Sequence, residues 1–131
     1  MAWYDADPNR LQKEVALMAE RSRAELRRVG AGLTWIEQLR SSAGQSYVLA
    51  IEYPERFPHE APRAYILSPD VSGAPHRFAD GSLCLWGDHV HGSGVKTTAV
   101  SVRSRAIAWF FVYEAWRRTG AWSAPEHGAP R

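Results

Sequence analysis

Cysteine is almost absent from this 131-residue sequence, in which Cys84 is the only one. A lone thiol excludes an internal disulfide, and we expect it to remain reduced in the cytoplasm. Four interpretations stay open for it: a buried packing residue, an intermolecular crosslink, a metal ligand short of partners, or a nucleophile. The nucleophile needs a positioned polar neighbour and access to solvent.

Three other features are missing. The sequence has no apolar run of 18 residues, and Met1 to Pro8 lack the basic and then apolar pattern of a secretory signal. Sixteen Lys and Arg against 14 Asp and Glu leave a net charge of +2, too small to indicate a nucleic-acid partner. We therefore expect a cytoplasmic protein without membrane or nucleic-acid partners. Its 45% hydrophobic residues and six tryptophans suit one domain over residues 1–131.

What the sequence does contain is a polar setting for the thiol. His76 lies eight residues before Cys84, and Asp80-Gly81-Ser82 predicts a turn between them. A turn at Pro75 and a second at Asp80-Gly81 would fold the segment back and bring His76 close to Cys84. We expect the thiol to be exposed at the rim of a shallow groove, beside a rigid flap.

That flap is predicted by prolines at four-residue spacing, Pro54, Pro58 and Pro62. Each proline removes a backbone donor, so the chain has to leave strand geometry. Tyr53 and Phe57 each precede a proline and are expected to be extended, with rings packed on the core.

Hydrophobic periodicity predicts an α+β domain. A helix is expected from Pro8 to about Val29, with Asp7 as N-cap, Pro8 in the first turn, and Gly30 and Gly32 ending it. Three strands follow as an antiparallel meander, and a helix then covers one face of the sheet. The expected strands are Leu33 to Leu39, Tyr47 to Tyr53 and Arg63 to Leu67, and the covering helix runs from about Val102 to Arg118.

In this order, the flap and the Gly81-Ser82-Leu83-Cys84-Leu85 segment resemble the ubiquitin-conjugating enzymes. Their aromatic-proline flap precedes a His-Pro-Asn turn and a Gly-x-x-Cys-Leu active site. Aligned on Cys84, the His-Pro-Asn turn falls on Ala74-Pro75-His76, so His76 replaces the asparagine. The resemblance implies a UBC-like fold with a leading helix, three to four strands, flap, active-site loop and trailing helix.

The resemblance also implies a reaction. Cys84 would form a thioester with the C-terminus of a protein supplied by an activating enzyme and pass the acyl group to an amine. His76 would stabilise the oxyanion, act as a base, or brace the loop. Asp80, Asp88, His89 and His91 are weaker candidates for positioning the incoming amine. His89 and His91 fall short of a closed zinc site, and neither metal nor cofactor is expected.

The short C-terminal region, His76 and the Leu83-Cys84-Leu85-Trp86 context resemble the bacterial, antiphage-operon (CBASS-type) branch of the family. That branch implies a cyclic-oligonucleotide synthase of the cGAS-like type as the protein substrate. Residues 86–94 would form a mobile gate, and residues 123–131 a flexible tail.

Two alternatives to the transferase remain. One is a non-catalytic module on the same fold that binds a ubiquitin-like or peptide partner. The other is an unrelated cysteine hydrolase that uses Cys84 and a histidine.

Overall fold

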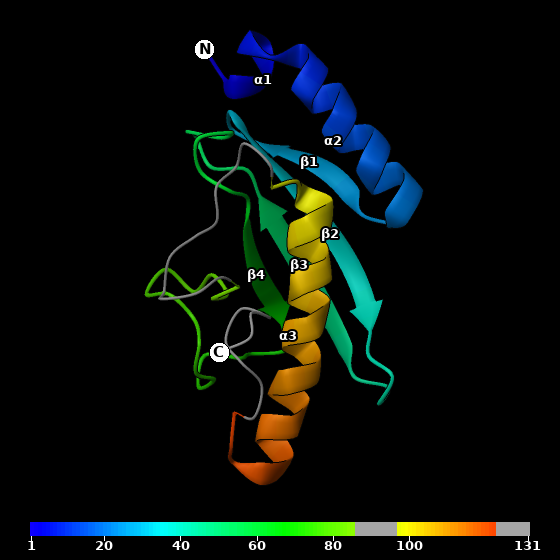
Figure 1. Ribbon diagram of the computed structural model, residues 1–131, viewed down its shortest axis with the longest axis vertical. Helices are drawn as coiled ribbons and strands as arrows, with labels where there is room; N and C mark the ends of the chain where they lie inside the picture. The colour runs from blue at the N-terminus through cyan, green and yellow to red at the C-terminus, as the bar shows by residue number, and fades with distance from the viewer. Residues whose placement is uncertain (86–96, 123–131) are drawn as a thin grey trace.

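A computed structural model describes residues 1–85 and 97–122, and Figure 1 shows its layers. A four-stranded antiparallel sheet in the order β1-β2-β3-β4 is crossed on one face by the long helix α3. The elements are α1 Trp3–Ala6, α2 Pro8–Arg21, β1 Glu25–Val29, β2 Gly32–Arg40, β3 Ser46–Glu52, β4 Arg63–Ser68 and α3 Ala99–Thr119. The α+β class, the antiparallel meander and the UBC-like order of elements predicted from the sequence are confirmed. None of the helices described is both long and apolar enough to cross a membrane.

Helix α2 begins as predicted and ends earlier than predicted. The Asp7 side chain accepts a hydrogen bond from the Arg10 N–H at 3.1 Å, and Pro8 occupies the first turn. At the other end, the N–H and the hydroxyl of Ser22 both donate to the Met18 carbonyl, at 2.8 Å each. This side-chain bond closes the last turn and lets the chain leave the helix.

The helix expected to continue to Val29 is therefore wrong in its second half. Residues 25–29 form β1, which pairs with β2 in the register Glu25↔Ile36 to Val29↔Gly32. Gly30, at φ 62°, makes the tight turn between the two strands. Leu26 and Val29 fit the three-residue helical step, but they belong to an exposed edge strand in which only Leu26 packs against the core.

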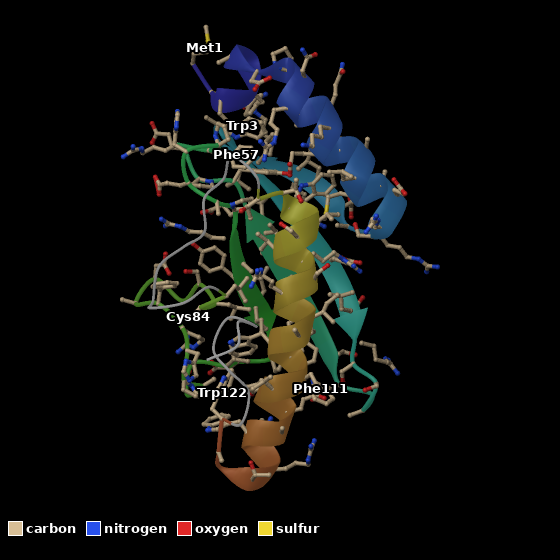
Figure 2. All side chains as sticks on the ribbon, in the orientation of Figure 1. Met1, Trp3, Phe57, Cys84, Phe111 and Trp122 are labelled. Carbon is tan, nitrogen blue, oxygen red and sulfur yellow. The ribbon has the colours of Figure 1, made fainter. Side chains whose placement is uncertain are left out.

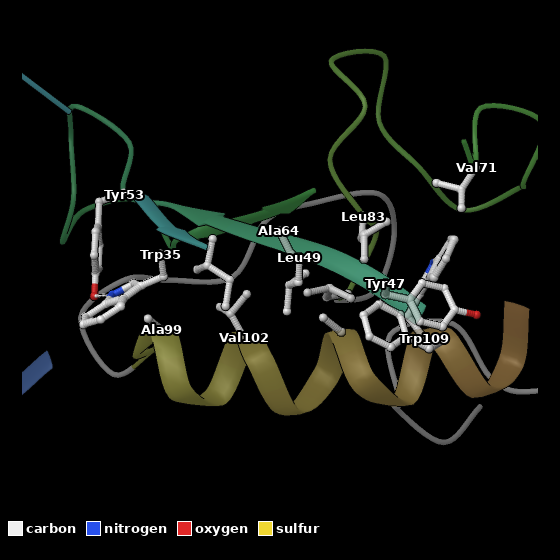
Figure 3. Close-up of a cluster of buried hydrophobic side chains, with 14 of the residues drawn as sticks. Trp35, Tyr47, Leu49, Tyr53, Ala64, Val71, Leu83, Ala99, Val102 and Trp109 are labelled. Carbon is white, nitrogen blue, oxygen red and sulfur yellow. Dashed lines mark hydrogen bonds between the residues drawn. The ribbon is translucent and has the colours of Figure 1, made fainter. Parts of the chain in front are cut away.

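The hydrophobic core lies between the sheet and α3 (Figure 3). Alternate residues of β2 are buried, because successive side chains of a strand point to opposite faces. In β3, Tyr47, Leu49 and Ile51 are buried at alternate positions, and Ala50 between them is buried as well. The residues at the alternate positions meet a continuous buried stripe of α3, and Tyr47 stacks on Phe110 with ring centroids 4.1 Å apart. The buried stripe consists of Ala99, Val102, Ala106, Trp109, Phe110 and Tyr113.

The flap between β3 and β4 is packed as predicted. Tyr53 and Phe57 are 3% and 2% exposed, and their rings meet edge to face at 4.8 Å. Trp3 of α1 covers Phe57 at 4.6 Å, and Figure 2 shows the two side by side. The three prolines lie between Glu52 and Arg63, outside the strand ladder. The aromatic residues thus anchor the flap, while the prolines hold its backbone out of the sheet.

A buried carboxylate joins α2, the flap and α3. Glu14, 1% exposed, accepts hydrogen bonds from Tyr53 Oη at 2.8 Å, the Ala99 N–H at 2.8 Å and Arg10 Nε at 3.1 Å. Tyr53 Oη also accepts from Trp35 Nε1 at 2.9 Å, the dashed line in Figure 3. Burial, with the Glu14 charge, raises the pKa of Tyr53 well above its usual value, so the hydroxyl stays a donor.

A second carboxylate fastens α3 to the sheet farther along. Glu37 of β2, 6% exposed, receives two bonds from Arg103, Nε to Oε1 at 2.6 Å and Nη2 to Oε2 at 2.9 Å. The Arg23 N–H donates to the same carboxylate at 3.2 Å. A bidentate pair of this kind fixes orientation as well as distance, so α3 is held to the sheet at a defined angle.

Glu14→Ala should lower the free energy of unfolding by about 3 to 5 kcal/mol, because it breaks the pair with Arg10 and leaves the Tyr53 hydroxyl and the Ala99 N–H buried without their acceptor. Glu14→Gln should cost less, since its amide oxygen still accepts one bond. Urea denaturation measures both. Glu20→Ala, at an exposed position of α2, is the control and should change stability by less than about 0.5 kcal/mol. Equal effects of Glu14→Ala and Glu20→Ala would contradict the role given to the buried carboxylate.

Phe57→Ala should cost about 3 to 5 kcal/mol, the range for truncating a buried aromatic residue. The loss includes its contacts with Trp3 and Tyr53 and the stacking of the Arg10 guanidinium, 4.7 Å from the ring centroid. Thermal or urea unfolding measures it, with His59→Ala, an exposed change in the same flap, as the control. An unchanged midpoint for Phe57→Ala would show that the flap does not contribute to the core.

Candidate functional site

The chain between His76 and Cys84 doubles back on itself. The Phe78 N–H donates to the Ser82 carbonyl at 2.8 Å, and the Gly81 N–H donates to the Phe78 carbonyl at 2.9 Å. Gly81 has φ 90°, which a residue with a side chain rarely adopts. The Cys84 N–H then donates to the His76 carbonyl at 2.9 Å. The predicted proximity of His76 and Cys84 is confirmed, through a bond between main-chain atoms.

Asp80 holds this turn together. Its carboxylate accepts hydrogen bonds from the Ser82 N–H at 2.9 Å and the Ser82 hydroxyl at 2.6 Å. It also pairs with Arg63, the first residue of β4, at 3.3 Å, and Arg63 pairs with Glu60 of the flap at 3.1 Å. These contacts connect the flap, the sheet and the turn before Cys84. The sequence predicted Asp80 as a candidate for substrate positioning, and the structure engages its carboxylate in organising the turn.

Cys84 is 2% exposed, so the expectation of an exposed thiol at a groove rim is wrong. The reason lies in its neighbours. The Leu83 N–H donates to the Ala64 carbonyl of β4 at 2.9 Å, and Arg77 and Leu83 form an antiparallel bridge. The segment is thus drawn against the edge of the sheet (Figure 2).

The residues next to Cys84 are buried as well. Leu83 and Leu85 are 2% and 3% exposed and belong to the hydrophobic cluster under α3. These two side chains therefore anchor the backbone on either side of Cys84.

Helix α3 also contacts the segment. Arg105 Nη1 donates to the Leu85 carbonyl at 3.1 Å and so fixes the main chain one residue after the thiol. Sequence analysis missed Arg105 and Arg63. An arginine on a helix or at a strand end usually indicates a solvated position, and only the tertiary fold brings these two to the site.

His76 adopts φ 61°, a left-handed conformation that is uncommon for residues with a side chain. Asn, Asp and His are the types enriched there. This accounts for a histidine where the family that the sequence resembles has asparagine, since both tolerate the required backbone. The His76 ring packs on Trp122, beyond the end of α3, with ring centroids 4.8 Å apart. Trp122 is a further contact that the sequence did not predict.

The remaining candidates, Asp88, His89 and His91, lie outside the residues that the structure describes, as do the expected gate and the expected C-terminal tail. Within the described ranges 1–85 and 97–122, no group of three or more His, Cys, Asp or Glu is placed to hold a metal ion.

Comparison with known proteins finds a curated relative and a family profile. "Ubiquitin-conjugating enzyme 15" of Arabidopsis thaliana is 42% identical over 43 residues. That alignment covers 33% of this chain and 26% of the plant protein, so the chain spans about a quarter of that relative's length. No solved structure matches.

The second match is a family profile described as "Type II CBASS E2 protein", which covers residues 13–130. The matched range contains Glu14, the flap, the His76 turn, Cys84 and α3. The fold and the order of these features had already indicated a ubiquitin-conjugating relative. With most of its length matched, the chain belongs to the type II CBASS E2 proteins.

Proposed function

We propose that the protein is a ubiquitin-conjugating-enzyme-like transferase in which Cys84 carries an acyl group as a thioester. An activating enzyme supplies the C-terminal acyl group of a partner protein, and Cys84 passes it to an amine. The observation that carries the proposal is the placement of Cys84 on a backbone fixed from both sides of the thiol, within the matched family range.

The transfer takes two steps. The Cys84 thiolate attacks the activated carbonyl carbon, an S–C bond forms, and the previous leaving group departs with its electron pair. The amine then attacks the same carbon and a C–N bond forms; the C–S bond breaks with its electron pair on sulfur, and the nitrogen loses a proton to a base or to water. Both tetrahedral intermediates place negative charge on the carbonyl oxygen, which fixed donors stabilise best.

The described contacts support such a nucleophile. The N–H of Cys84 is held by the His76 carbonyl, the preceding N–H by Ala64, and the following carbonyl by Arg105. Three bonds on consecutive residues leave the Cα–Cβ direction of Cys84 little freedom. A reacting atom attached to a rigid backbone needs little reorganisation in the transition state.

His76 is the residue that we assign to support discharge of the thioester. Its position corresponds to the family asparagine, and its imidazole is able to donate a hydrogen bond or bind a proton near neutral pH. The packing of its ring on Trp122 supports a further part of this role, in which His76 braces the turn that carries the Cys84 contact.

For the partners, we infer an activating enzyme and a protein substrate with a free C-terminus. A cyclic-oligonucleotide synthase of the cGAS-like type, encoded in the same operon, is the substrate that family membership favours. Neither role requires a cofactor on this chain, because the thioester stores the energy of the activated acyl group.

The burial of Cys84 favours a second candidate function, a non-catalytic module that binds a ubiquitin-like or peptide partner. A thiol that is 2% exposed has to become accessible before it attacks a macromolecular substrate. The binding module needs no such change. Detection of a covalent adduct separates the two functions.

In the first experiment, the wild-type protein is incubated with the activating enzyme, the synthase and ATP, and analysed on a non-reducing gel. A band shift that a thiol reductant removes is expected. Cys84→Ala should give no adduct, and Cys84→Ser should give one that resists reduction, because an oxygen ester replaces the thioester. Thermal unfolding checks that both variants fold. A complex without a covalent adduct would support the binding module, and an adduct that persists in Cys84→Ala would overturn the assignment of the nucleophile.

A second experiment measures discharge of the preformed thioester to an added amine in single-turnover conditions. His76→Ala should slow discharge by about 100-fold, the order expected for a lost oxyanion donor. His76→Asn should retain part of the rate, since asparagine tolerates the positive φ and keeps a donor. His76→Gly is the matched control, because glycine adopts φ 61° without strain but has no side chain.

Comparison of the discharge rates of these variants distinguishes a role of the His76 imidazole from a role of its backbone conformation. Slow discharge in both His76→Ala and His76→Gly indicates the imidazole. Slow discharge in His76→Ala alone indicates strain in the turn, and wild-type rates in all three variants would show that His76 has no part in transfer.

A further inference from the structure

The chain reverses direction immediately after α3. Gly120 ends the helix with φ 78°, and its N–H donates to the Trp116 carbonyl at 2.7 Å. The Ala121 N–H then donates to the Thr119 hydroxyl at 3.1 Å. These two bonds return the chain toward the helix and determine where Trp122 lies (Figure 2).

Trp122 lies between the core and the His76 turn. Its ring centroid is 4.8 Å from that of His76 and 5.4 Å from that of Trp109, a core residue 5% exposed. Trp109 in turn stacks on Tyr113 at 5.2 Å. A continuous row of rings therefore connects the buried face of α3 to His76.

The position that this row reaches is a strained one. His76 is the only residue other than glycine with a positive φ among the described residues, and such a conformation persists only where its surroundings enforce it. The carbonyl of the same residue accepts the Cys84 N–H at 2.9 Å. Whatever fixes the His76 ring also restricts the orientation of this carbonyl, and with it the backbone of Cys84.

We propose that Trp122 is a positioning residue of the transferase, which holds the His76 turn against Cys84 from the end of α3. It acts through His76 and touches no reacting atom. The proposal rests on the proposed function for its catalytic meaning, but its structural part concerns the hydrogen bond between His76 and Cys84 and is measurable without any substrate.

Trp116 offers a matched control. It belongs to the same aromatic group, with its ring centroid 6.0 Å from Tyr113 and 6.4 Å from Trp122, and it is half-buried like Trp122. No ring contact joins it to His76. Removal of either tryptophan takes an indole from the group, but only one removal takes a contact from His76.

The test is amide hydrogen exchange at Cys84 by NMR in the full chain, compared among wild type, Trp122→Ala and Trp116→Ala. Trp122→Ala should accelerate exchange at Cys84 by roughly tenfold while core amides of β3 remain protected. Trp116→Ala should leave exchange at Cys84 within about twofold of wild type. Unchanged exchange in Trp122→Ala, or equal acceleration in both variants, overturns the proposal.

Three further variants keep the test decisive. If Trp122→Ala does not fold, Trp122→Phe and Trp122→Leu replace it: phenylalanine should preserve protection of Cys84, and leucine, which lacks a ring, should not. In the His76→Gly background, Trp122→Ala should add nothing, because the ring that it contacts is absent. A further acceleration in that background would show that Trp122 does not act through His76.

The activity measurement is separate. With the thioester assay, Trp122→Ala should slow discharge in proportion to the change in exchange, and His76→Gly should abolish this dependence. If the wild-type protein forms no thioester but Trp122→Ala still accelerates exchange at Cys84, the proposed function fails and the positioning contact stands. If the thioester forms and exchange does not change, the positioning role fails and the transferase stands.

Discussion

The buried charge of Glu14 is the constraint on which the arrangement of the chain depends. A carboxylate that is taken out of water needs hydrogen-bond donors, and here they come from a tyrosine at the start of the flap, from the first N–H of α3 and from an arginine on its own helix. The donor at α3 is one that the helix itself cannot satisfy. The negative charge also lies at the positive end of the helix dipole. One side chain thus requires α2, the flap and α3 to meet at a single point.

The position of the segment that carries Cys84 depends on the edge of the sheet formed by β4. Arg63, the first residue of β4, pairs with Glu60 of the flap and with Asp80 of the turn before Cys84. These pairs are partly exposed, so each contributes little to global stability. Their effect is geometric, because they set the turn beside the strand that receives the Leu83 N–H. Stability and site geometry are therefore controlled by different charges in this fold.

Much of the fold could be predicted from local signals. The Asp7-Pro8 start of α2, the alternation in β2 and β3 and the prolines of the flap each determine structure within a few residues. Strand β1, which was predicted as part of a helix, shows where local signals are insufficient. Leu26 and Val29 are spaced for a helix, and the difference is made by Ser22, whose hydroxyl bonds the Met18 carbonyl, and by pairing with β2. Pairing partners are not visible in a local pattern.

The contacts of the candidate site likewise include some that local sequence signals predict and others that they do not. The closeness of His76 and Cys84 followed from turn residues in one short segment, whereas Arg105 and Trp122 reach it only through the packing of α3. The burial of Cys84 was missed because the turn indicated a surface loop. Its segment is held at the edge of β4 by the hydrogen bond from the Leu83 N–H to the carbonyl of Ala64, a residue that is distant in the sequence.

Helix α3 has 21 residues, and at 1.5 Å per residue it spans about 30 Å. Its first N–H is fixed by Glu14, and the turn after its last residue places Trp122 on His76. The length of α3 therefore sets the distance between the contact with Glu14 and the contact of Trp122 with His76. Insertion or deletion of one residue would rotate everything beyond it by about 100° and shift it along the axis. The exposed face, where Phe111 is 70% exposed, is free to vary in residue type, but the number of residues in α3 is not.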